Sequence, residues 1–262
     1  MNNIKPKKRL GQHFLRDKNI AARIAGSLTG EGYINVIEVG PGMGMLTQFL
    51  LQRNFPNFVA AEIDRESVTY LRERFGDDLS IIEKDFLRLD LESLFDGNFA
   101  ITGNFPYNIS SQIFFRAIEY RHKVREVTGM IQKEVAERIH SRPGSKQYGI
   151  LSVLLQAWYS TEILFTVPPH LFFPMPKVNS AVIRLRRNKV ERLDCDEDLF
   201  IRVVKSAFNQ RRKTLRNALR ARFSVQGIDD KVLSLRAEQL SVNSFAELTR
   251  IIEGNINHGK ED

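Results

Sequence analysis

The sequence predicts a doubly wound α/β domain, in which helices cover both faces of a seven-stranded, mostly parallel sheet, followed by a smaller all-helical domain. Short apolar runs alternate with helix-like stretches up to about residue 187, and strand signals stop after Asn188. The 262 residues, 42% of them hydrophobic, are enough for one full core and a small appendage. We therefore expect two domains, 1–187 and 188–262.

Seven short apolar runs are predicted to form the strands of the sheet. In chain order they are residues 36–39, 58–63, 80–82, 100–102, 127–131, 162–167 and 180–185. Apolar runs of this length without regular alternation are typical of strands that are buried on both faces, as in parallel sheets.

The stretches between these runs have the length and spacing of helices. A first helix is expected after Asp17, which is a suitable N-cap, because Ile20 and Ile24 follow a helical period. Further helices are expected at residues 45–52, 67–75, 111–120, 134–140 and 150–159. Asp64 and Ser110 are plausible N-caps for two of them.

The C-terminal part is helical and strongly basic. After a linker at 188–196, helices are expected at residues 198–209, 213–223, 230–240 and 245–255. Residues 184–222 hold 13 Lys or Arg against five Asp or Glu, an excess equal to the net charge of +8 on the whole chain. Such a stripe is typical of a surface that binds nucleic-acid phosphates, although a solvated basic face is the ordinary alternative.

Composition argues against membrane and metal proteins. Residues 1–9 are polar and basic, and no apolar run is long enough to cross a bilayer, so we expect a soluble, cytoplasmic protein. The single cysteine, Cys195, has no internal disulfide partner, and the five histidines are scattered without metal-ligand spacing. We therefore expect no metal site.

A glycine-rich turn follows the first strand of the sheet. Gly40, Gly42 and Gly44 let the main chain approach a ligand at the carboxyl end of that strand. A dinucleotide-binding loop has its third glycine one position later, where this chain has Met45, so a nicotinamide-dependent oxidoreductase is disfavoured. A nucleoside with an amino-acid tail does not need the pyrophosphate position at the helix N-terminus.

Two carboxylates are expected at the ends of the next two strands. Glu62, 22 residues after Gly40, is placed to accept hydrogen bonds from both hydroxyls of a ribose. Asp85 is placed to accept a hydrogen bond from an adenine amine. Taken singly, each is equally well explained as a helix cap or a surface charge. Together, at successive strand ends, they predict a pocket for an adenosine.

The fourth strand ends in Asn104-Phe105-Pro106-Tyr107, which is either a simple turn or a methyl-transfer motif. The adenine amine is a poor nucleophile, because its lone pair is delocalised into the ring. The Asn104 side-chain oxygen and the Phe105 carbonyl are placed to accept both amine hydrogens, and Pro106 helps to hold that carbonyl. Tyr107 offers a stacking face for an extruded base. Phe172 is a candidate for a second aromatic wall beside the extruded base, although an aromatic side chain in a Pro-rich loop is more often packed in the hydrophobic core.

Five motifs in order carry a resemblance to a known family. They are residues 11–15 (Gly-Gln-His-Phe-Leu), the loop at 40–44, and the segments 104–107, 172–181 and 207–217. Together they resemble the KsgA-type ribosomal RNA small-subunit adenine N6,N6-dimethyltransferase family, over nearly the whole chain. The resemblance implies a Rossmann-like class I methyltransferase that uses S-adenosylmethionine. It also implies dimethylation of two adjacent adenines in the 3′-terminal hairpin of 16S rRNA, late in small-subunit biogenesis.

The resemblance further implies roles for individual residues. Cofactor contacts are implied at His13, Leu15, Gly40, Gly42, Glu62, Ile63, Asp85, Phe86 and Asn104. Catalytic roles are implied for Asn104, Pro106, Tyr107 and Phe172. Substrate contacts are implied for Phe105 and, in the part similar to the docking region, for Arg211, Arg212, Lys213 and Arg216. At His13 this chain departs from the Asn that most relatives carry there.

Two alternatives remain open beside the small-subunit enzyme. One is a sister class that methylates an adenine of large-subunit rRNA, although the segment 210–215 favours the small subunit. The other is a ribosome-assembly or transcription factor that kept the fold and lost the chemistry, against which the intact Gly40, Glu62, Asp85 and Asn104 argue. We expect a monomer whose partner is small-subunit rRNA within a pre-assembled particle, with no membrane partner.

Overall fold

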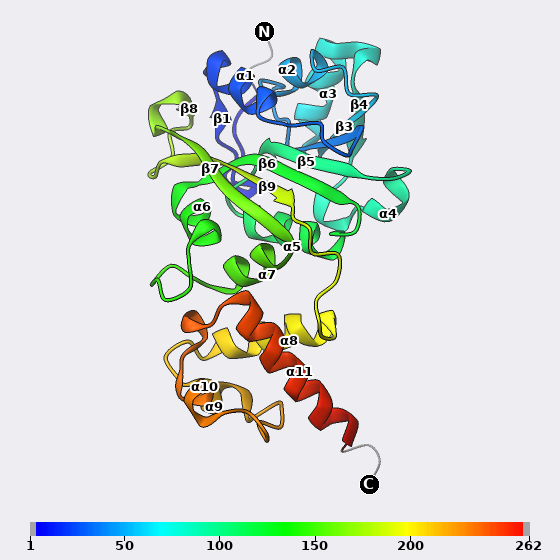
Figure 1. The fold of residues 1–262 in the computed structure, drawn as a ribbon. Helices are drawn as coiled ribbons and strands as arrows, with labels where there is room; N and C mark the ends of the chain where they lie inside the picture. Colours follow the sequence, from blue (N-terminus) through cyan, green and yellow to red (C-terminus); the bar gives the residue numbers. More distant parts are fainter. Residues whose placement is uncertain (1–3, 259–262) are drawn as a thin grey trace. The chain divides into compact units, whose positions relative to one another are not determined.

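The computed structural model, which describes residues 4–258, has the doubly wound architecture expected from the sequence (Figure 1). Its main sheet has seven strands in the order β4-β3-β2-β5-β6-β9-β7. Strands β4, β3, β2, β5 and β6 pair in parallel, whereas β9 is antiparallel to β6. The prediction of a seven-stranded, mostly parallel sheet is therefore confirmed.

Each predicted strand is present, with small changes at its ends. The strands are β2 (Asn35–Val39), β3 (Asn57–Glu62), β4 (Ser80–Glu83), β5 (Phe99–Asn104), β6 (Val124–Gln132), β7 (Tyr159–Val167) and β9 (Ser180–Arg187). Two further strands were not predicted. They are β1 (Phe14–Leu15) and β8 (Phe172–Phe173), which form a separate antiparallel pair.

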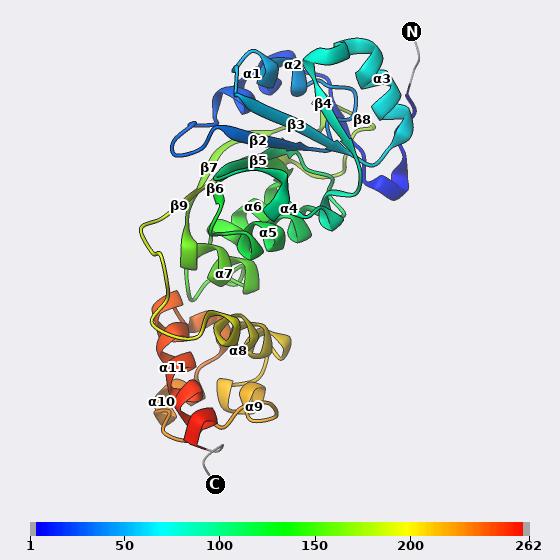
Figure 2. The same cartoon turned by 90° about the vertical axis from the view of Figure 1, so that its right-hand side faces the viewer.

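Helices cover both faces of the parallel strands. Figure 2 shows α1 (Lys18–Gly26), α2 (Thr47–Leu51) and α3 (Arg65–Phe75) on one face, and α4 (Leu91–Leu94) and α5 (Ser110–Glu119) on the other. On the first face, α1 and α2 bury Ile24 and Leu50 in a core cluster with Val36 and Met130 of the sheet. Burial on both faces explains why the strand signals in the sequence are continuous apolar runs.

The predicted helix caps are only partly correct. Asp17 caps α1, since its carboxylate accepts a hydrogen bond from the Ile20 N–H at 2.9 Å. Asp64 occupies the N-cap position of α3 without a cap hydrogen bond, and its carboxylate accepts instead from the Lys7 ammonium and from the Ser67 hydroxyl. Ser110 is the first residue inside α5, where Ile109 takes the cap position, and its hydroxyl donates back to the Tyr107 carbonyl.

The chain divides into two compact units that differ from the predicted domains in one segment. The first unit contains residues up to Ala136 together with Thr161–Arg187, and the second contains Glu137–Ser160 and the chain from Asn188. The segment Glu137–Ser160 holds the second half of α6 (Lys133–His140) and all of α7 (Ile150–Trp158). It groups with the C-terminal helices because Trp158 packs edge-on against Phe200, with ring centroids 5.8 Å apart.

The second unit contains α8 (Glu197–Asn209), α9 (Leu215–Leu219), α10 (Asp230–Ser234) and α11 (Val242–His258). The predicted helix at 213–223 is thus reduced to five residues, and the one at 230–240 is split. The split follows from an extended conformation at Leu235, whose carbonyl accepts from the Leu215 N–H at 2.8 Å. Over residues 4–258, no helix combines the length and the apolar character that crossing a bilayer requires.

Candidate active site

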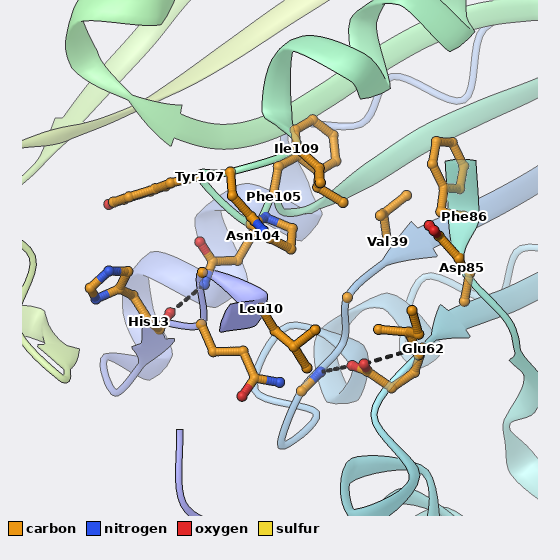
Figure 3. Close-up of a pocket in the computed structure, with 18 of the residues that line it drawn as sticks. Leu10, His13, Val39, Glu62, Asp85, Phe86, Asn104, Phe105, Tyr107 and Ile109 are labelled. Carbon is orange, nitrogen blue, oxygen red and sulfur yellow. Dashed lines mark hydrogen bonds between the residues drawn. The ribbon is translucent and has the colours of Figure 1, made fainter. Parts of the chain in front are cut away.

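A cavity of about 240 Å³ lies in the first unit, where the carboxyl ends of β2, β3 and β5 meet the segment that follows β4. This is the position expected for a ligand in an open α/β sheet. Figure 3 shows side chains from these separate elements directed into one space. The predicted site residues that line it are His13, Gly40, Gly42, Glu62, Ile63, Asp85, Phe86, Asn104, Phe105, Pro106 and Tyr107.

The glycine loop forms one wall of this cavity. Gly40 and Gly42 have φ angles of 69° and 57°, in the left-handed region that favours glycine. A Cβ atom on Gly42 would lie 2.8 Å from the ring of Phe14, which also lines the cavity. Gly44 has a different role, because a Cβ atom there would lie 2.5 Å from the ring of Phe75 in α3. Two of the three glycines therefore shape the cavity, and the third allows close helix packing.

Glu62, at the end of β3, is 4% exposed and is hydrogen-bonded to the glycine loop. Its carboxylate accepts hydrogen bonds from the N–H groups of Gly42 at 3.1 Å and of Ile63 and Asp64 at 2.9 Å each. Burial raises the pKa of Glu62, and the three N–H groups oppose that shift because they stabilise the charged form. The carboxylate is thus held rigidly at the cavity wall (Figure 3).

Asp85 fits both of the interpretations that its sequence position allowed. Its Oδ1 accepts from the Leu87 N–H at 3.0 Å and caps a short 3₁₀ turn, yet the residue also lines the cavity. Beside it, Phe86 is buried, whereas Ile63 is 51% exposed at the same cavity. An exposed isoleucine next to buried aromatic and acidic groups is typical of the wall of a ligand pocket.

The amide of Asn104 has a defined orientation. Its Nδ2 donates to the main-chain carbonyl of His13 at 2.8 Å (Figure 3). Because a carbonyl only accepts hydrogen bonds, this contact assigns the NH₂ group to the His13 side and leaves Oδ1 as a free acceptor. No donor from residues 4–258 contacts Oδ1.

The carbonyl of Phe105 is a second acceptor without a donor in the described part of the chain. The Phe105 N–H donates to Met130 at 3.0 Å, which fixes the peptide at the end of β5. The Phe105 ring is buried and fills the space above two glycines, since a Cβ atom on Gly129 would lie 2.6 Å from it. The side chain is therefore an anchor, and the carbonyl is the part available to a substrate.

Tyr107 packs against His13 instead of standing free. The two ring centroids are 5.0 Å apart with an interplanar angle of 31°, and the Tyr107 hydroxyl lies 2.5 Å from the Ser180 Oγ. Burial raises the pKa of Tyr107, so its hydroxyl is neutral at physiological pH. The His13 Nδ1 donates to the Pro174 carbonyl at 2.7 Å. His13 therefore connects the Asn104 amide, the Tyr107 ring and the loop after β8.

Leu15 and Phe172 do not line this cavity, which corrects the prediction for Phe172. Leu15 lines a second cavity that shares Phe14, Gly40 and Asn104 with the first, so its contact with the cofactor stays a prediction. In the antiparallel β1–β8 pair, Leu15 is opposite Phe172 and Phe14 is opposite Phe173. Successive side chains of a strand point to opposite faces, so each pair shares one face. Leu15 and Phe172 are 5% and 3% exposed in the apolar core, whereas Phe14 lines the cavity and Phe173 is exposed. Phe172 is therefore a residue of the hydrophobic core in this structure.

Sequence reasoning missed the part of the N-terminal segment that forms a cavity wall. Leu10, Gln12 and Phe14 all line the cavity. The segment is held near the end of β3 by Lys7, whose Nζ lies 2.5 Å from an oxygen of Asp64, and its Arg9 carbonyl accepts from Asn108 at 3.3 Å. In the sequence, the motif at residues 11–15 was the signal that this segment belongs to the site.

The predicted docking residues of the second unit have different environments. Arg211 donates to the carbonyls of Lys146 and Tyr148 and so stabilises the loop between α6 and α7. Arg216 forms an ion pair with Asp230 at 2.5 Å. Arg212 and Lys213 are exposed, and their side chains form no hydrogen bond or ion pair within residues 4–258.

Metal binding receives no support from the described residues, among which no cluster of three or more His, Cys, Asp or Glu side chains is suited to hold an ion.

Comparisons with known proteins agree with one another. The family described as ribosomal RNA adenine dimethylase matches residues 3–253. The chain is 55% identical over 257 residues to the ribosomal RNA small subunit methyltransferase A of Phocaeicola vulgatus, covering 97% of this chain and 91% of that protein. It is 53% identical over 260 residues to the protein of the same name from Cytophaga hutchinsonii, covering 97% and 100%.

Solved structures share the fold over most of the chain. A dimethyladenosine transferase from Plasmodium falciparum superposes with a TM-score of 0.71 at 23% identity, covering 90% of this chain and 96% of that one. The 23S rRNA methyltransferase ErmE superposes with a TM-score of 0.66 at 28% identity, covering 90% and 99%.

Proposed function

The chain belongs to the ribosomal RNA adenine dimethylase family, and we propose that Asn104 and Phe105 present an adenine amine to S-adenosylmethionine bound in the cavity. The protein is an S-adenosylmethionine-dependent rRNA adenine N6,N6-dimethyltransferase. Its substrate is small-subunit rRNA, in which it dimethylates two adjacent adenines of the 3′-terminal hairpin of 16S rRNA late in subunit biogenesis.

The observation that carries this function is a pair of acceptors, Asn104 Oδ1 and the Phe105 carbonyl, that receive no donor from residues 4–258. An adenine amine has two hydrogens, and two acceptors set at an angle draw that nitrogen from planar toward tetrahedral geometry. The lone pair is then localised on N6, where a nucleophile is needed. Both acceptors are fixed before the substrate arrives, by His13 and by the end of β5, so no reorganisation is required during the reaction.

The remaining cavity residues fit S-adenosylmethionine. The Glu62 carboxylate suits the ribose hydroxyls, the second oxygen of Asp85 suits the adenine amine, and Ile63 with Phe86 suits the faces of the adenine ring. Gly40 and Gly42 allow the main chain to approach the ligand closely. When bound, the cofactor supplies a methyl group on a sulfonium, which N6 takes as the carbon–sulfur bond breaks and an amine proton passes to water.

The chain needs no strong general base for this chemistry, because the methylated amine is acidic and loses its proton to solvent. Its residues act by positioning. Holding two reactants in a near-attack geometry contributes as much as about 7–11 kcal/mol in favourable cases. Tyr107, neutral and braced by His13, supplies an aromatic surface for the extruded base.

The small-subunit substrate is favoured over the large-subunit one by the relatives. Proteins named as small-subunit enzymes are 52–55% identical to this chain, whereas the 23S rRNA methyltransferase ErmE is 28% identical. We expect the purified protein to methylate small subunits that lack these methyl groups. Incorporation of tritium from labelled S-adenosylmethionine and primer extension on the product locate the modified nucleotides. Label found only in large-subunit rRNA would contradict the proposal.

The two predicted domains have separate roles in this proposal. Residues 1–187 bind the cofactor and the target base, and residues 188–262 dock a monomer on a pre-assembled small-subunit particle in the cytoplasm. The exposed pair Arg212 and Lys213 supports this role, because free cations are what a phosphate backbone requires.

Particle binding is expected to weaken steeply with salt, and the double variant Arg212→Ala/Lys213→Ala is expected to reduce that dependence. Each lost phosphate contact lowers the slope of log K against log salt by about 0.7–0.9. Sedimentation of the complex at several salt concentrations measures the slope, with Arg72→Ala in α3 as a control that leaves it unchanged. A flat salt dependence in the parent protein would rule out this docking surface.

A further inference from the structure

The loop between α6 and α7 carries two exposed cations and no acidic residue. Its sequence, residues 141–149, is Ser-Arg-Pro-Gly-Ser-Lys-Gln-Tyr-Gly. Arg142 and Lys146 are both exposed, and within residues 4–258 neither side chain forms a hydrogen bond or an ion pair. The loop belongs to the second unit, together with α8 to α11. Two cations of this unit are therefore free to contact a negatively charged partner.

The main chain of this loop is fixed although its cations are exposed. The Gly144 N–H donates to the Glu238 carbonyl at 2.7 Å. The ring of Tyr148 is fully buried and packs against Phe208 of α8, with ring centroids 6.4 Å apart. A loop that is anchored at its middle and near its end presents its side chains before a partner arrives, which reduces the ordering that binding has to impose.

Arg211 supplies a third anchor of the loop. Its guanidinium donates to the carbonyls of Lys146 and Tyr148, the second bond at 3.3 Å. The planar guanidinium holds its donors in a fixed fork, which suits two carbonyls on one side of it. Because Arg211 directly precedes the exposed Arg212 and Lys213, these contacts bring the turn after α8 beside the loop. The cations of the loop therefore adjoin those of the proposed docking region.

We propose that the α6–α7 loop binds phosphates of the small-subunit rRNA through Arg142 and Lys146. In this arrangement Arg211 is a positioning residue, which holds the loop for the contact. The inference rests on the proposed function and extends the docking surface into a segment outside residues 188–262. A phosphate backbone carries regularly spaced negative charges, so adjoining segments that each present cations match it. Donors of Arg211 that bond to the loop are not available to a phosphate, whereas those of Arg142 and Lys146 are.

The first test measures the salt dependence of binding to small subunits that lack the methyl groups. In Arg142→Ala/Lys146→Ala, the slope of log K against log salt is expected to fall by about 1.4–1.8, as the loss of two phosphate contacts predicts. Gln147→Ala, at an exposed and uncharged position in the same loop, is the matched control and is expected to leave the slope unchanged. Thermal unfolding is expected to be nearly unaffected in both variants, because all three side chains are exposed.

A second test separates positioning by Arg211 from a phosphate contact of its own. In the otherwise unchanged protein, Arg211→Ala is expected to weaken particle binding about 2- to 12-fold, the usual cost of ordering one long side chain of an interface. In the Arg142→Ala/Lys146→Ala background, the same change is expected to have no further effect on affinity or slope. A residue that itself contacts a phosphate would lower the slope by about 0.7–0.9 more in that background.

An unchanged slope in Arg142→Ala/Lys146→Ala, with a parent protein that methylates small subunits, would overturn this inference and leave the proposed function intact. A further fall of the slope on adding Arg211→Ala would contradict the positioning role. Deproteinised 16S rRNA is expected to show the same slope change as the particle. A change seen only with the particle would point to an acidic protein surface and would also overturn the inference. A parent protein inactive on small subunits would instead refute the proposed function.

Discussion

Replacing Asn104 with alanine is expected to lower the rate of adenine methylation by at least about 10²–10³-fold, as the loss of a preorganised polar group in an active site does. The variant removes the Oδ1 acceptor and the donor to the His13 carbonyl together. Particle binding is expected to be retained, because the proposed docking residues lie in the C-terminal part. A paired methylation and sedimentation assay on the same protein preparation measures both quantities.

Asn104→Asp tests the acceptor role of Oδ1 separately from the donor role of Nδ2. It keeps an acceptor of the same shape, but it replaces the donor to His13 with a negative oxygen facing a carbonyl 2.8 Å away. We expect this variant to be nearly as inactive as Asn104→Ala, because the repulsion turns the group from its position. Activity equal to that of the parent in either variant would contradict the role of Asn104.

Glu38→Gln is expected to stabilise the protein at pH 8 relative to the parent. Glu38 is fully buried and accepts a hydrogen bond from the Thr47 hydroxyl, and burial raises its pKa from 4.5 to about 8. Since the folded protein holds this proton more tightly than the unfolded chain, the stability it contributes is present below pH 4.5. That contribution is lost as the pH rises toward 8, by up to about 1.4 kcal/mol per pH unit.

The glutamine variant cannot lose a proton, so its advantage over the parent is expected to grow by about 4 kcal/mol between pH 4.5 and pH 8. Denaturant unfolding at both pH values measures it. Glu126→Gln is the matched control, because that buried carboxylate accepts from Thr29, Tyr33 and Thr128, and an amide would turn an NH₂ group toward these donors. It is expected to destabilise the protein at both pH values. An advantage of Glu38→Gln that is independent of pH would refute the explanation.

The sequence alone predicted the seven strands of the sheet and most of the residues around the cavity. Gly40, Glu62, Asp85 and Asn104 lie at or just after the ends of four different strands, and parallel strands bring their carboxyl ends to one edge of a sheet. Neighbouring strands of the order β4-β3-β2-β5 therefore place these residues together, although no two of them are close in the sequence. Local apolar runs were sufficient to predict that these four residues lie at one edge of the sheet.

The tertiary structure alone decided which side chains face the site from the short β1–β8 pair and how His13 is used. A two-residue strand has no periodic signal, and a shift of one residue in its register would exchange Phe172 for Phe173. His13 reaches Asn104 across 91 positions and Pro174 across 161. Strand runs are local properties of the chain, whereas these contacts depend on how distant segments pack, so only the folded protein determines them.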